Sequence, residues 1–337
     1  MEEIRDNQDE TNEMYEHFRF LVDKKQALLR IDKYLFTKIA NASRNRIQNA
    51  SRAGNILVND VVVKPNYKVK PCDVISIVMA YPPRDTEIYP EDIPVHVVYE
   101  DDDVLVINKP AGMVVHPGHG NFSGTLLNAL AFYYQGTGIT AYLCHRIDKD
   151  TSGILLLAKN ELAQTKLARQ FFDHTIDRKY LALVWGNLQE DEGTINGNLG
   201  RDPRNRLVMK VFEDEETGRH AVTHYRVIER LGYVTLIECV LETGRTHQIR
   251  VHMKHIGHPL FNDESYGGNV ILKGTTFTKY KQFVQNCFKV MPRQALHAKS
   301  LGFIHPTSGK KVFFDSELPD DFRDLLEKWR DYAKHAL

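Results

Sequence analysis

The sequence predicts an α+β protein in which a small α/β domain precedes a large domain with a mixed, mostly antiparallel sheet. Two observations predict this fold class. In the larger part, short β-rich runs and helical patterns mix irregularly, without the regular strand–helix–strand order of a doubly wound fold. In the smaller part, two helical patterns precede the β-rich runs. The length of 337 residues allows two domains, and a charged content of 26% is ordinary for a globular protein.

The small domain is expected over residues 24–80. Leucine and isoleucine recur at helical spacing over 28–40, which predicts a first helix. Ser43 is a suitable N-cap for a second helix that Gly54 ends, and Ile47 lies on its inward face. The next stretch, NILVNDVVVKP, has two β-rich runs around Asn-Asp and predicts a hairpin, and DVISIV predicts a further strand.

The large domain is expected over residues 95–337. Its β-rich runs lie at 104–107, 180–185, 221–229, 234–241 and 301–304. Its helical patterns lie at about 124–133, 160–174 and 318–335. Between the domains, residues 81–94 contain four prolines and many acids, which predicts an extended linker. Residues 1–23 are acidic and polar and are expected to form a tail.

Charge is segregated along the chain although the formal net charge is zero. Residues 24–70 contain eleven Lys and Arg against two Asp, a balance of +9. Residues 81–103 carry one Arg against eight acids, and residues 1–20 carry two Arg against seven. A basic module between acidic segments predicts a local site for a polyanion, with a solvated basic face as the alternative.

The sequence also indicates the cellular setting. Four widely spaced cysteines form no CxxC pair, which favours reduced thiols over a disulfide framework or a zinc site. The acidic N-terminus lacks the apolar stretch of a secretory signal, and no apolar run approaches the roughly 20 residues of a membrane helix. We therefore expect a soluble, cytoplasmic protein without membrane association.

Several cofactor and metal motifs are missing or unconvincing. No GxGxxG follows a strand, and neither GxxxxGK[ST] nor GxSxG occurs, which excludes the common nucleotide and hydrolase signatures. The segment THQIRVHMKHIGHP contains four closely spaced histidines: His247, His252, His255 and His258. Two arginines and a lysine among them would repel a cation, so we expect no metal there and favour structural histidines or RNA contacts.

Two other segments are candidates for chemistry. Arg245 and Arg250 suit an anion site, because arginine forms forked, charge-assisted bonds to carboxylate or phosphate; pairing with surface acids is the alternative. The stretch CHRIDKDTSGILLLAKN places charged residues directly before the most apolar run of the chain. From the residues alone, it is either an ordinary loop before a core element or a carboxylate held at the edge of a rigid scaffold.

These segments carry a family resemblance. HRIDxxTSG with ILLLAKN, then DRKYLALVWG, GRTHQIRVH and RQALHAKSLGFIHP, resemble in residue pattern and order the motifs of the RluA family of pseudouridine synthases. DDVLVINKPAGMVVHPG resembles that family's opening motif, so the likeness covers about residues 90–337. The small domain, with RIDKYL and SRNRIQNASRAGNILVND, resembles the S4 RNA-binding domain. The closest subgroup is the S4-containing synthases that act on large-subunit (23S) ribosomal RNA.

The resemblance implies isomerisation of uridine in RNA, a reaction that requires no cofactor. Asp148 occupies the place of the family's catalytic aspartate in HRID, whereas Asp150 is expected to serve only as a loop residue. Whether Asp148 attacks the ribose C1′ or opens a glycal route stays undecided. Tyr180 matches the family tyrosine that contacts uracil, although an isolated tyrosine in such a strand is usually structural. Arg250 matches the arginine that pairs with the aspartate, with Arg245 as the second choice.

Contacts with RNA follow from the same resemblance. The target base must be flipped out of folded RNA, and Arg146, next to His145, suits the gap that the base leaves. In the S4-like domain, Arg44, Arg46 and Arg52 are expected to lie on RNA phosphates. We expect RNA as the partner and a monomeric chain. The alternative function is a non-catalytic RNA-binding factor in ribosome assembly; an S4-fused methyltransferase lacks support, because no glycine-rich cofactor loop is present.

Overall fold

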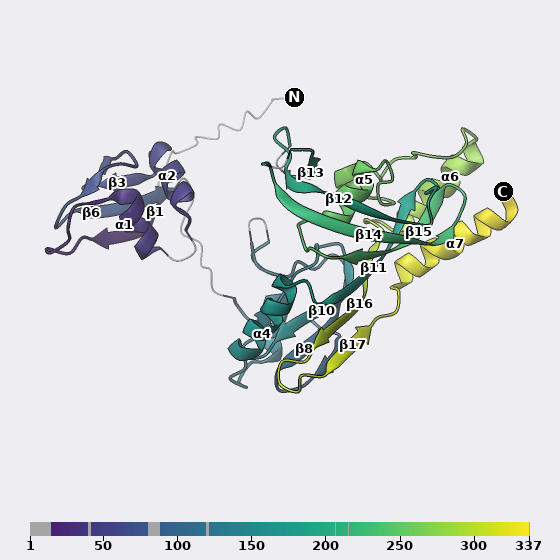
Figure 1. Cartoon of the computed structure of the whole chain (residues 1–337), viewed down its shortest axis with the longest axis horizontal. Coiled ribbons are helices and arrows are strands. Elements are labelled where there is room, and N and C mark those ends of the chain that lie inside the picture. The colour runs from purple at the N-terminus through teal and green to yellow at the C-terminus, as the bar shows by residue number, and fades with distance from the viewer. Residues whose placement is uncertain are drawn as a thin grey trace, which may run out of the picture. The chain divides into compact units, whose positions relative to one another are not determined.

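The computed structural model describes residues 15–39, 42–79, 88–118, 121–205, 207–214 and 216–336. The chain divides into two compact units, Met1–Glu87 and Ile88–Leu337 (Figure 1). Among the described residues, no helix is long and apolar enough to cross a membrane. The first fourteen residues of the predicted tail, and residues 81–87 of the predicted linker, lie outside the described residues.

In its described residues, the first unit contains a four-stranded sheet and two helices. In spatial order the strands are β1 (Tyr15–Leu21), β6 (Val74–Met79), β3 (Ile56–Val58) and β4 (Val61–Val62). A separate short pair joins β2 (Leu29–Arg30) to β5 (Lys68–Val69). The helices are α1 (Ile31–Lys38) and α2 (Arg44–Arg52), both shorter than the predicted ranges. They bury Ile31, Leu35 and Ile47 against the sheet.

Local signals of the first unit explain its turns and caps. Ser43 accepts a hydrogen bond from the backbone N–H of Arg46 at 3.3 Å, as an N-cap does. Asn59 and Asp60, between β3 and β4, both have positive φ, the conformation that a two-residue hairpin turn requires and that these residue types tolerate. The predicted second helix and hairpin are therefore confirmed.

The predicted tail over 1–23 is wrong for its last part. Residues 15–21 form strand β1, which pairs antiparallel with β6. Phe20 and, just beyond the strand, Val22 pack onto the small core, and Val22 is 1% exposed. The strand was not predicted because it has few apolar side chains among many charged ones. It is stabilised by backbone hydrogen bonds to β6, which the local sequence does not indicate.

The second unit is built on one large sheet, whose main path runs in the order β13, β12, β14, β15, β11, β16, β10, β8, β7. The strands are β7 (Val97–Glu100), β8 (Val104–Lys109), β9 (Tyr142–Leu143), β10 (Ser152–Ala158), β11 (Asp177–Trp185), β12 (Glu192–Arg201), β13 (Met209–Phe212), β14 (Arg219–Arg230), β15 (Val234–Leu241), β16 (Leu296–Ile304) and β17 (Lys311–Asp315). β17 pairs with β16 and β9 with β10. Among the pairings of described strands, β10 with β16 is the parallel one and the rest are antiparallel. The predicted α+β class with a mostly antiparallel sheet is confirmed.

Five helices of the second unit pack against this sheet: α3 (Leu126–Tyr133), α4 (Glu161–Phe172), α5 (Gln248–His255), α6 (Thr278–Val290) and α7 (Asp320–Ala336). Arg250 lies on helix α5. The helical patterns of the sequence did not predict α6. Figure 1 shows α6 and α7 side by side; they bury a second core around Trp185 and Trp329.

The second unit begins earlier than the predicted boundary at residue 95. Residues 88–94 belong to it. The carboxylate of Glu91 accepts hydrogen bonds from the N–H of Gly124, just before α3, and the Asn128 side chain donates to the carbonyl of Tyr89. From residue 88 on, the stretch predicted as a linker is therefore part of the second unit and is fastened to it by these bonds.

Strand β10 is the rigid support of the charged stretch that precedes it. All of its residues are buried. Ile154 and Leu156 face the core under α4, whereas Leu155 and Leu157 face the core under α3. Because side chains alternate along a strand, burial on both faces requires the continuous apolar run ILLLA, and each such side chain stabilises the fold by about 1.5–3 kcal/mol.

Gly153 fixes how closely β10 approaches β16. Its φ is +115°, and Ser152 and Gly153 pair in parallel with His297 and Ala298. A Cβ at Gly153 would overlap the carbonyl oxygen of Ala298 and lie only 2.8 Å from its nitrogen. A side chain there would therefore push apart the two strands that hold the preceding loop.

Candidate active site

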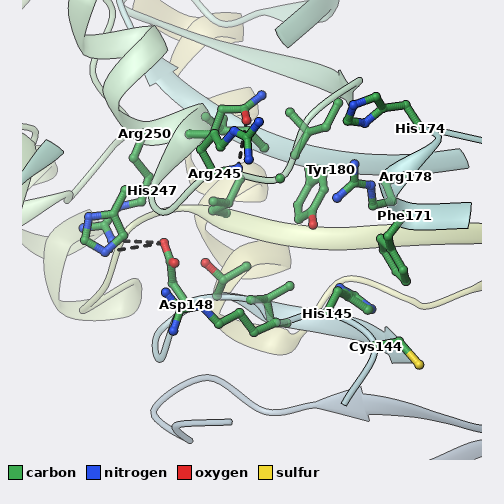
Figure 2. A pocket seen from close by; sticks show the side chains of 18 of the residues that line it. Cys144, His145, Asp148, Phe171, His174, Arg178, Tyr180, Arg245, His247 and Arg250 are labelled. Carbon is green, nitrogen blue, oxygen red and sulfur yellow. Dashed lines mark hydrogen bonds and ion pairs between the residues drawn. The ribbon is translucent and has the colours of Figure 1, made fainter. Parts of the chain in front are cut away.

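A cavity of about 490 Å³ opens where the loop before β10 faces β11 and the segment leading into α5. The loop supplies residues 144–148, β11 supplies Arg178 and Tyr180, and the α5 segment supplies residues 244, 245 and 247–250. Figure 2 shows these side chains converging on it. The predicted site residues of the large domain all line this cavity: His145, Arg146, Asp148, Tyr180, Arg245 and Arg250.

Asp148 presents a partly exposed carboxylate at the edge of the cavity. Its Oδ2 accepts a hydrogen bond from Arg250 Nη1 at 3.1 Å and lies 4.0 Å from Nε2 of His247. The side chain is 23% exposed, so a ligand in the cavity can reach it. The structure thus places Arg250, and not Arg245, against Asp148 (Figure 2).

Arg250 is held in place from behind by Asp263. Arg250 Nε donates to Asp263 Oδ2 at 2.7 Å and Nη2 donates to Oδ1 at 2.8 Å, which is a forked pair. Burial lowers the pKa of Arg250, but Asp263 and Asp148 outweigh burial and raise that pKa above its ordinary value. Asp263 is fully buried. The guanidinium is therefore a fixed cation, and its Nη1 stays available for Asp148.

Asp263 was not found from the sequence. It lies in the stretch FNDESYGG and has no periodic or motif partner that marks it. Asp263 accepts a hydrogen bond from the N–H of Tyr266 as the N-cap of a short 3-10 helix, Glu264–Tyr266. Only the fold brings this cap beneath α5.

Tyr180 projects from β11 toward the same cavity and is 7% exposed. Burial raises the pKa of Tyr180, and the Asp148 carboxylate adds to this effect, while Arg178 opposes it. The hydroxyl therefore stays protonated at neutral pH. A buried neutral phenol offers a flat ring and a hydrogen-bond donor to a ligand.

His145 serves the loop more than the cavity. Its Nε2 accepts a hydrogen bond from the N–H of Leu156 in β10 at 3.0 Å, and its ring stacks on Phe171 of α4. Burial and the neighbouring Arg178 lower the pKa of His145 to about 3, so the ring is neutral. This histidine fastens the loop to the rigid strand and lines the cavity only with the rest of its ring.

Arg146 and Arg245 both line the cavity. Arg146 is exposed and its Nη2 donates to Thr246 Oγ1 at 3.2 Å. Arg245 is partly buried, and its Nε donates to the carbonyl of His220 at 3.1 Å. Both arginines line the same cavity as Asp148, but the hydrogen bonds of their guanidinium groups go to neutral groups.

His247 is a cavity residue that sequence reasoning assigned no separate role. It precedes α5 with φ +56°, the left-handed conformation. Its Nδ1 lies 2.9 Å from the Tyr266 hydroxyl, which also accepts the N–H of Met209. Its Nε2 lies 4.0 Å from Asp148 Oδ2. The other histidines of that segment bind elsewhere: His252 to Thr223, and His258 to the carbonyl of Trp185.

Lys109 also anchors the loop that carries Asp148. It is fully buried, and its ammonium group donates to the carbonyls of Pro110, Met113 and Lys149 at 2.7–2.9 Å. Three N–H donors meet three acceptors. The backbone next to Asp148 is therefore held by Lys109 as well as by His145.

The three arginines predicted to contact RNA in the first unit differ in their surroundings. Arg44 Nη2 forms an ion pair with Asp32 at 2.9 Å, beside Gln48 and Arg30. Burial would raise the pKa of the fully buried Asp32, but these hydrogen bonds lower it far below its usual value. Arg52 donates to Asn49, and Arg46 is exposed on α2. Arg44 is thus partly a structural cation.

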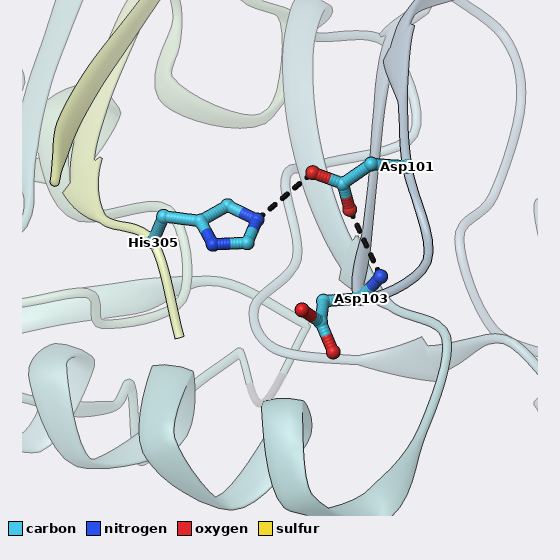
Figure 3. A group of neighbouring side chains, drawn as sticks. All are labelled: Asp101, Asp103 and His305. Atoms are coloured by element: carbon cyan, nitrogen blue, oxygen red, sulfur yellow. Dashed lines mark hydrogen bonds and ion pairs between the residues drawn. The ribbon is translucent and has the colours of Figure 1, made fainter. Parts of the chain in front are cut away.

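One cluster of potential metal ligands occurs among the described residues, formed by Asp101, Asp103 and His305 (Figure 3). His305 Nδ1 accepts the N–H groups of Thr307 and Ser308, so its Nε2–H donates to Asp101 at 2.9 Å. The other Asp101 oxygen accepts the N–H of Asp103. The ligand atoms are occupied by hydrogen bonds that join the β7–β8 turn to the β16–β17 turn, which is a structural role.

Comparison with known proteins identifies the family to which this chain and its site belong. The family model described as RNA pseudouridylate synthase matches residues 103–255, and the S4 domain model matches residues 29–75. A protein of Chlorobaculum parvum named uncharacterized RNA pseudouridine synthase is 46% identical over 317 residues, which cover 92% of this chain and 96% of that protein. The chain belongs to the RNA pseudouridine synthase family.

Further relatives of this pseudouridine synthase agree. The ribosomal large subunit pseudouridine synthase D of Zymomonas mobilis is 43% identical, over 88% of this chain and 93% of that protein. The solved structure of human RNA pseudouridylate synthase domain containing 1 is 28% identical and matches with a TM-score of 0.51, over 67% of this chain and 84% of that one. The resemblances to the RluA family and the S4 domain are confirmed. The synthase is an enzyme, and its substrate is RNA.

Proposed function

We propose that this synthase converts uridine to pseudouridine in large-subunit ribosomal RNA, with Asp148 as its catalytic carboxylate. The observation that carries the proposal is the Asp148 carboxylate, held by Arg250 at the edge of a cavity that also presents Tyr180. The rRNA target is supported by relatives such as the Zymomonas mobilis protein, named a ribosomal large subunit pseudouridine synthase.

The reaction explains why a fixed carboxylate is needed. The bond between uracil N1 and ribose C1′ breaks, the base turns, and C5 joins C1′ while the C5 proton leaves. Nothing is oxidised and no group enters from outside. Positive charge develops near C1′, and a carboxylate answers that demand as it does in retaining glycosidases. Among the described residues, both polar contacts of the Asp148 carboxylate use Oδ2, so Oδ1 is the oxygen left to attack C1′ or to remove a sugar proton.

Tyr180 and Arg250 support the carboxylate in different ways. Arg250 fixes the orientation of Asp148, because Asp263 fixes Arg250. Tyr180 is buried and neutral, so we assign it contact with the uracil ring and not removal of the C5 proton. Arg245 and His145 line the cavity without touching Asp148, and we assign them to substrate binding and loop support.

Arg146 is suited to base flipping. It is exposed, its guanidinium is planar, and it is two residues before Asp148 on a loop fastened by Lys109 and His145. Such a group can stack in the space that a flipped uridine leaves in the RNA. We further propose that the synthase works as a monomer in the cytoplasm and needs no cofactor.

Pseudouridine mapping tests the proposed target. Large-subunit ribosomal RNA from cells that lack this synthase should lose pseudouridine at one or more positions that wild-type cells modify, and the Asp148→Asn variant should not restore them. The same map in both cell types would instead favour a non-catalytic factor in ribosome assembly.

The first unit yields a binding prediction. Arg46→Ala and Arg52→Ala should each weaken RNA binding and reduce its salt dependence by about one counterion, because both side chains are exposed cations on α2. Arg44→Ala should in addition lower the thermal midpoint of the unit, because the buried Asp32 loses an ion-pair partner.

The matched control is Arg19→Ala, which removes another exposed arginine, on β1, that is paired with Glu16 at 3.2 Å. It should leave RNA affinity close to wild type. If the three α2 variants and the control all bound RNA with wild-type affinity across a salt titration, α2 would not be part of the RNA-binding surface.

A further inference from the structure

A second cavity, of about 440 Å³, adjoins the catalytic one. The two cavities share Arg146, Gly244 and Arg245 as lining residues. The far side of the second cavity is formed by the ends of β12 and β13 and the start of β14, where Arg219 stands. Whatever occupies the catalytic cavity can therefore continue into the second one past Arg146 and Arg245.

The second cavity has an unbalanced charge. Its charged lining residues are Arg146, Arg219 and Arg245, and none of its described lining residues is acidic. Within the described part of the chain, none of these three guanidinium groups forms an ion pair with a carboxylate; Arg146 and Arg245 donate to neutral oxygens instead. Three cations around one hollow without a counter-charge favour an anionic ligand.

The backbone around Arg219 fixes where that side chain begins. In the pairing of β12 with β14, Arg219 lies opposite Leu199. Gly218, just before it, has φ +88°, and a Cβ there would lie 2.8 Å from the carbonyl carbon of Leu199. The strands can meet this closely only because residue 218 has no side chain. Arg219 is therefore an exposed arginine on a defined backbone, not on a free loop.

We propose that this second cavity binds a backbone phosphate of the RNA next to the flipped uridine, and that Arg219 is a binding residue for it. The inference rests on the proposed function, which puts the uridine in the adjoining cavity. A strand that enters the catalytic cavity must leave it again, and each nucleotide carries one phosphate. Arginine binds phosphate through forked, charge-assisted bonds, and such contacts set the register of the RNA without reading its sequence.

The test measures RNA binding by Arg219→Ala, Arg219→Lys and the control Arg226→Ala. Arg226 lies on the same strand, is 60% exposed and is paired with Glu238 at 3.2 Å, so the control removes the same charge away from the cavity. The probe is unmodified large-subunit ribosomal RNA transcribed in vitro, titrated at several salt concentrations. Thermal midpoints of the variants establish that they are folded.

For Arg219→Ala we expect about tenfold weaker binding, a salt slope shallower by about one, and a fall of similar size in kcat/KM for isomerisation. Arg219→Lys should keep the salt slope, because it keeps the charge. Arg226→Ala should bind and react like wild type. Wild-type affinity and salt slope in Arg219→Ala, or an equal loss in Arg226→Ala, would overturn the proposal.

These outcomes are separate from those that bear on the proposed function. Binding is measured whether or not the RNA is isomerised. If wild type binds the transcript and isomerises it but Arg219→Ala binds equally well, the second cavity is not a phosphate site and the function stands. If wild type fails to isomerise any ribosomal RNA, the function fails, and the salt slopes still decide whether Arg219 contacts phosphate.

Discussion

Asp148→Asn should abolish isomerisation while the variant still binds RNA. Asparagine keeps the shape of the side chain, but a neutral amide can neither attack C1′ nor take up a proton. Removal of a central catalytic carboxylate typically costs on the order of 10⁴-fold or more in rate. Arg250 stays in place in the variant because its forked pair with Asp263 is intact. Single-turnover kinetics with ribosomal RNA transcripts measure the loss, and a binding titration with the same RNA measures what remains.

Asp150→Asn is the matched control. It removes the same charge two residues further along the same loop. The contact of Asp150 with Arg293 is made by its backbone carbonyl, at 2.9 Å, and an asparagine keeps that carbonyl. We expect most of the activity to remain. A loss as large as that of Asp148→Asn would show that the general charge of the loop, and not one carboxylate, is required.

Arg250→Met should lower both stability and activity. The substitution leaves Asp263, which is fully buried, without the guanidinium that binds both of its oxygens. Breaking a buried ion pair by removing one partner typically costs about 3–5 kcal/mol. Asp148 also loses its hydrogen-bond partner, so isomerisation should fall as well. Chemical denaturation measures the free energy of unfolding, and isomerisation of the RNA transcript measures the second effect.

The double variant Arg250→Met with Asp263→Asn separates the two effects. Neutralising Asp263 removes the unpaired buried charge, so part of the stability should return while isomerisation stays low. Arg245→Met serves as the comparison for stability, because Arg245 is only partly buried and its Nε binds a backbone carbonyl. If Arg250→Met unfolded with the same free energy as wild type, the buried pair would not hold the site together.

Local signals made much of the fold predictable from the sequence. Ser43 and Gly54 bounded the second helix, Asn59-Asp60 marked the hairpin, and the run at 154–158 had to be a buried element. The motif segments also came together as the family resemblance implied, since the loop before β10, the strand with Tyr180 and the segment with Arg250 line one cavity. Signals of this kind depend on neighbours in the sequence.

What the sequence left out depends on neighbours in space. Asp263 is a cap residue whose partner lies on another helix, and its importance follows only from its position behind Arg250. Strand β1 is stabilised by pairing with β6 across the length of the first unit. Arg44 looked like a free cation on a helix, but the fold places it over the buried Asp32. Arg219 belongs to no sequence motif, and only its position in the wall of the second cavity indicates a role in binding.

Release of tritium from uracil C5 tests the central claim most directly. Joining C5 to C1′ expels the hydrogen at C5. RNA labelled with tritium at that carbon therefore releases the label when the uridine is isomerised, and RNA binding alone releases none. Wild type should release the label from a ribosomal RNA transcript that it binds, and Asp148→Asn should release none while it binds the same RNA. Binding by wild type without release from any ribosomal RNA fragment would contradict the account.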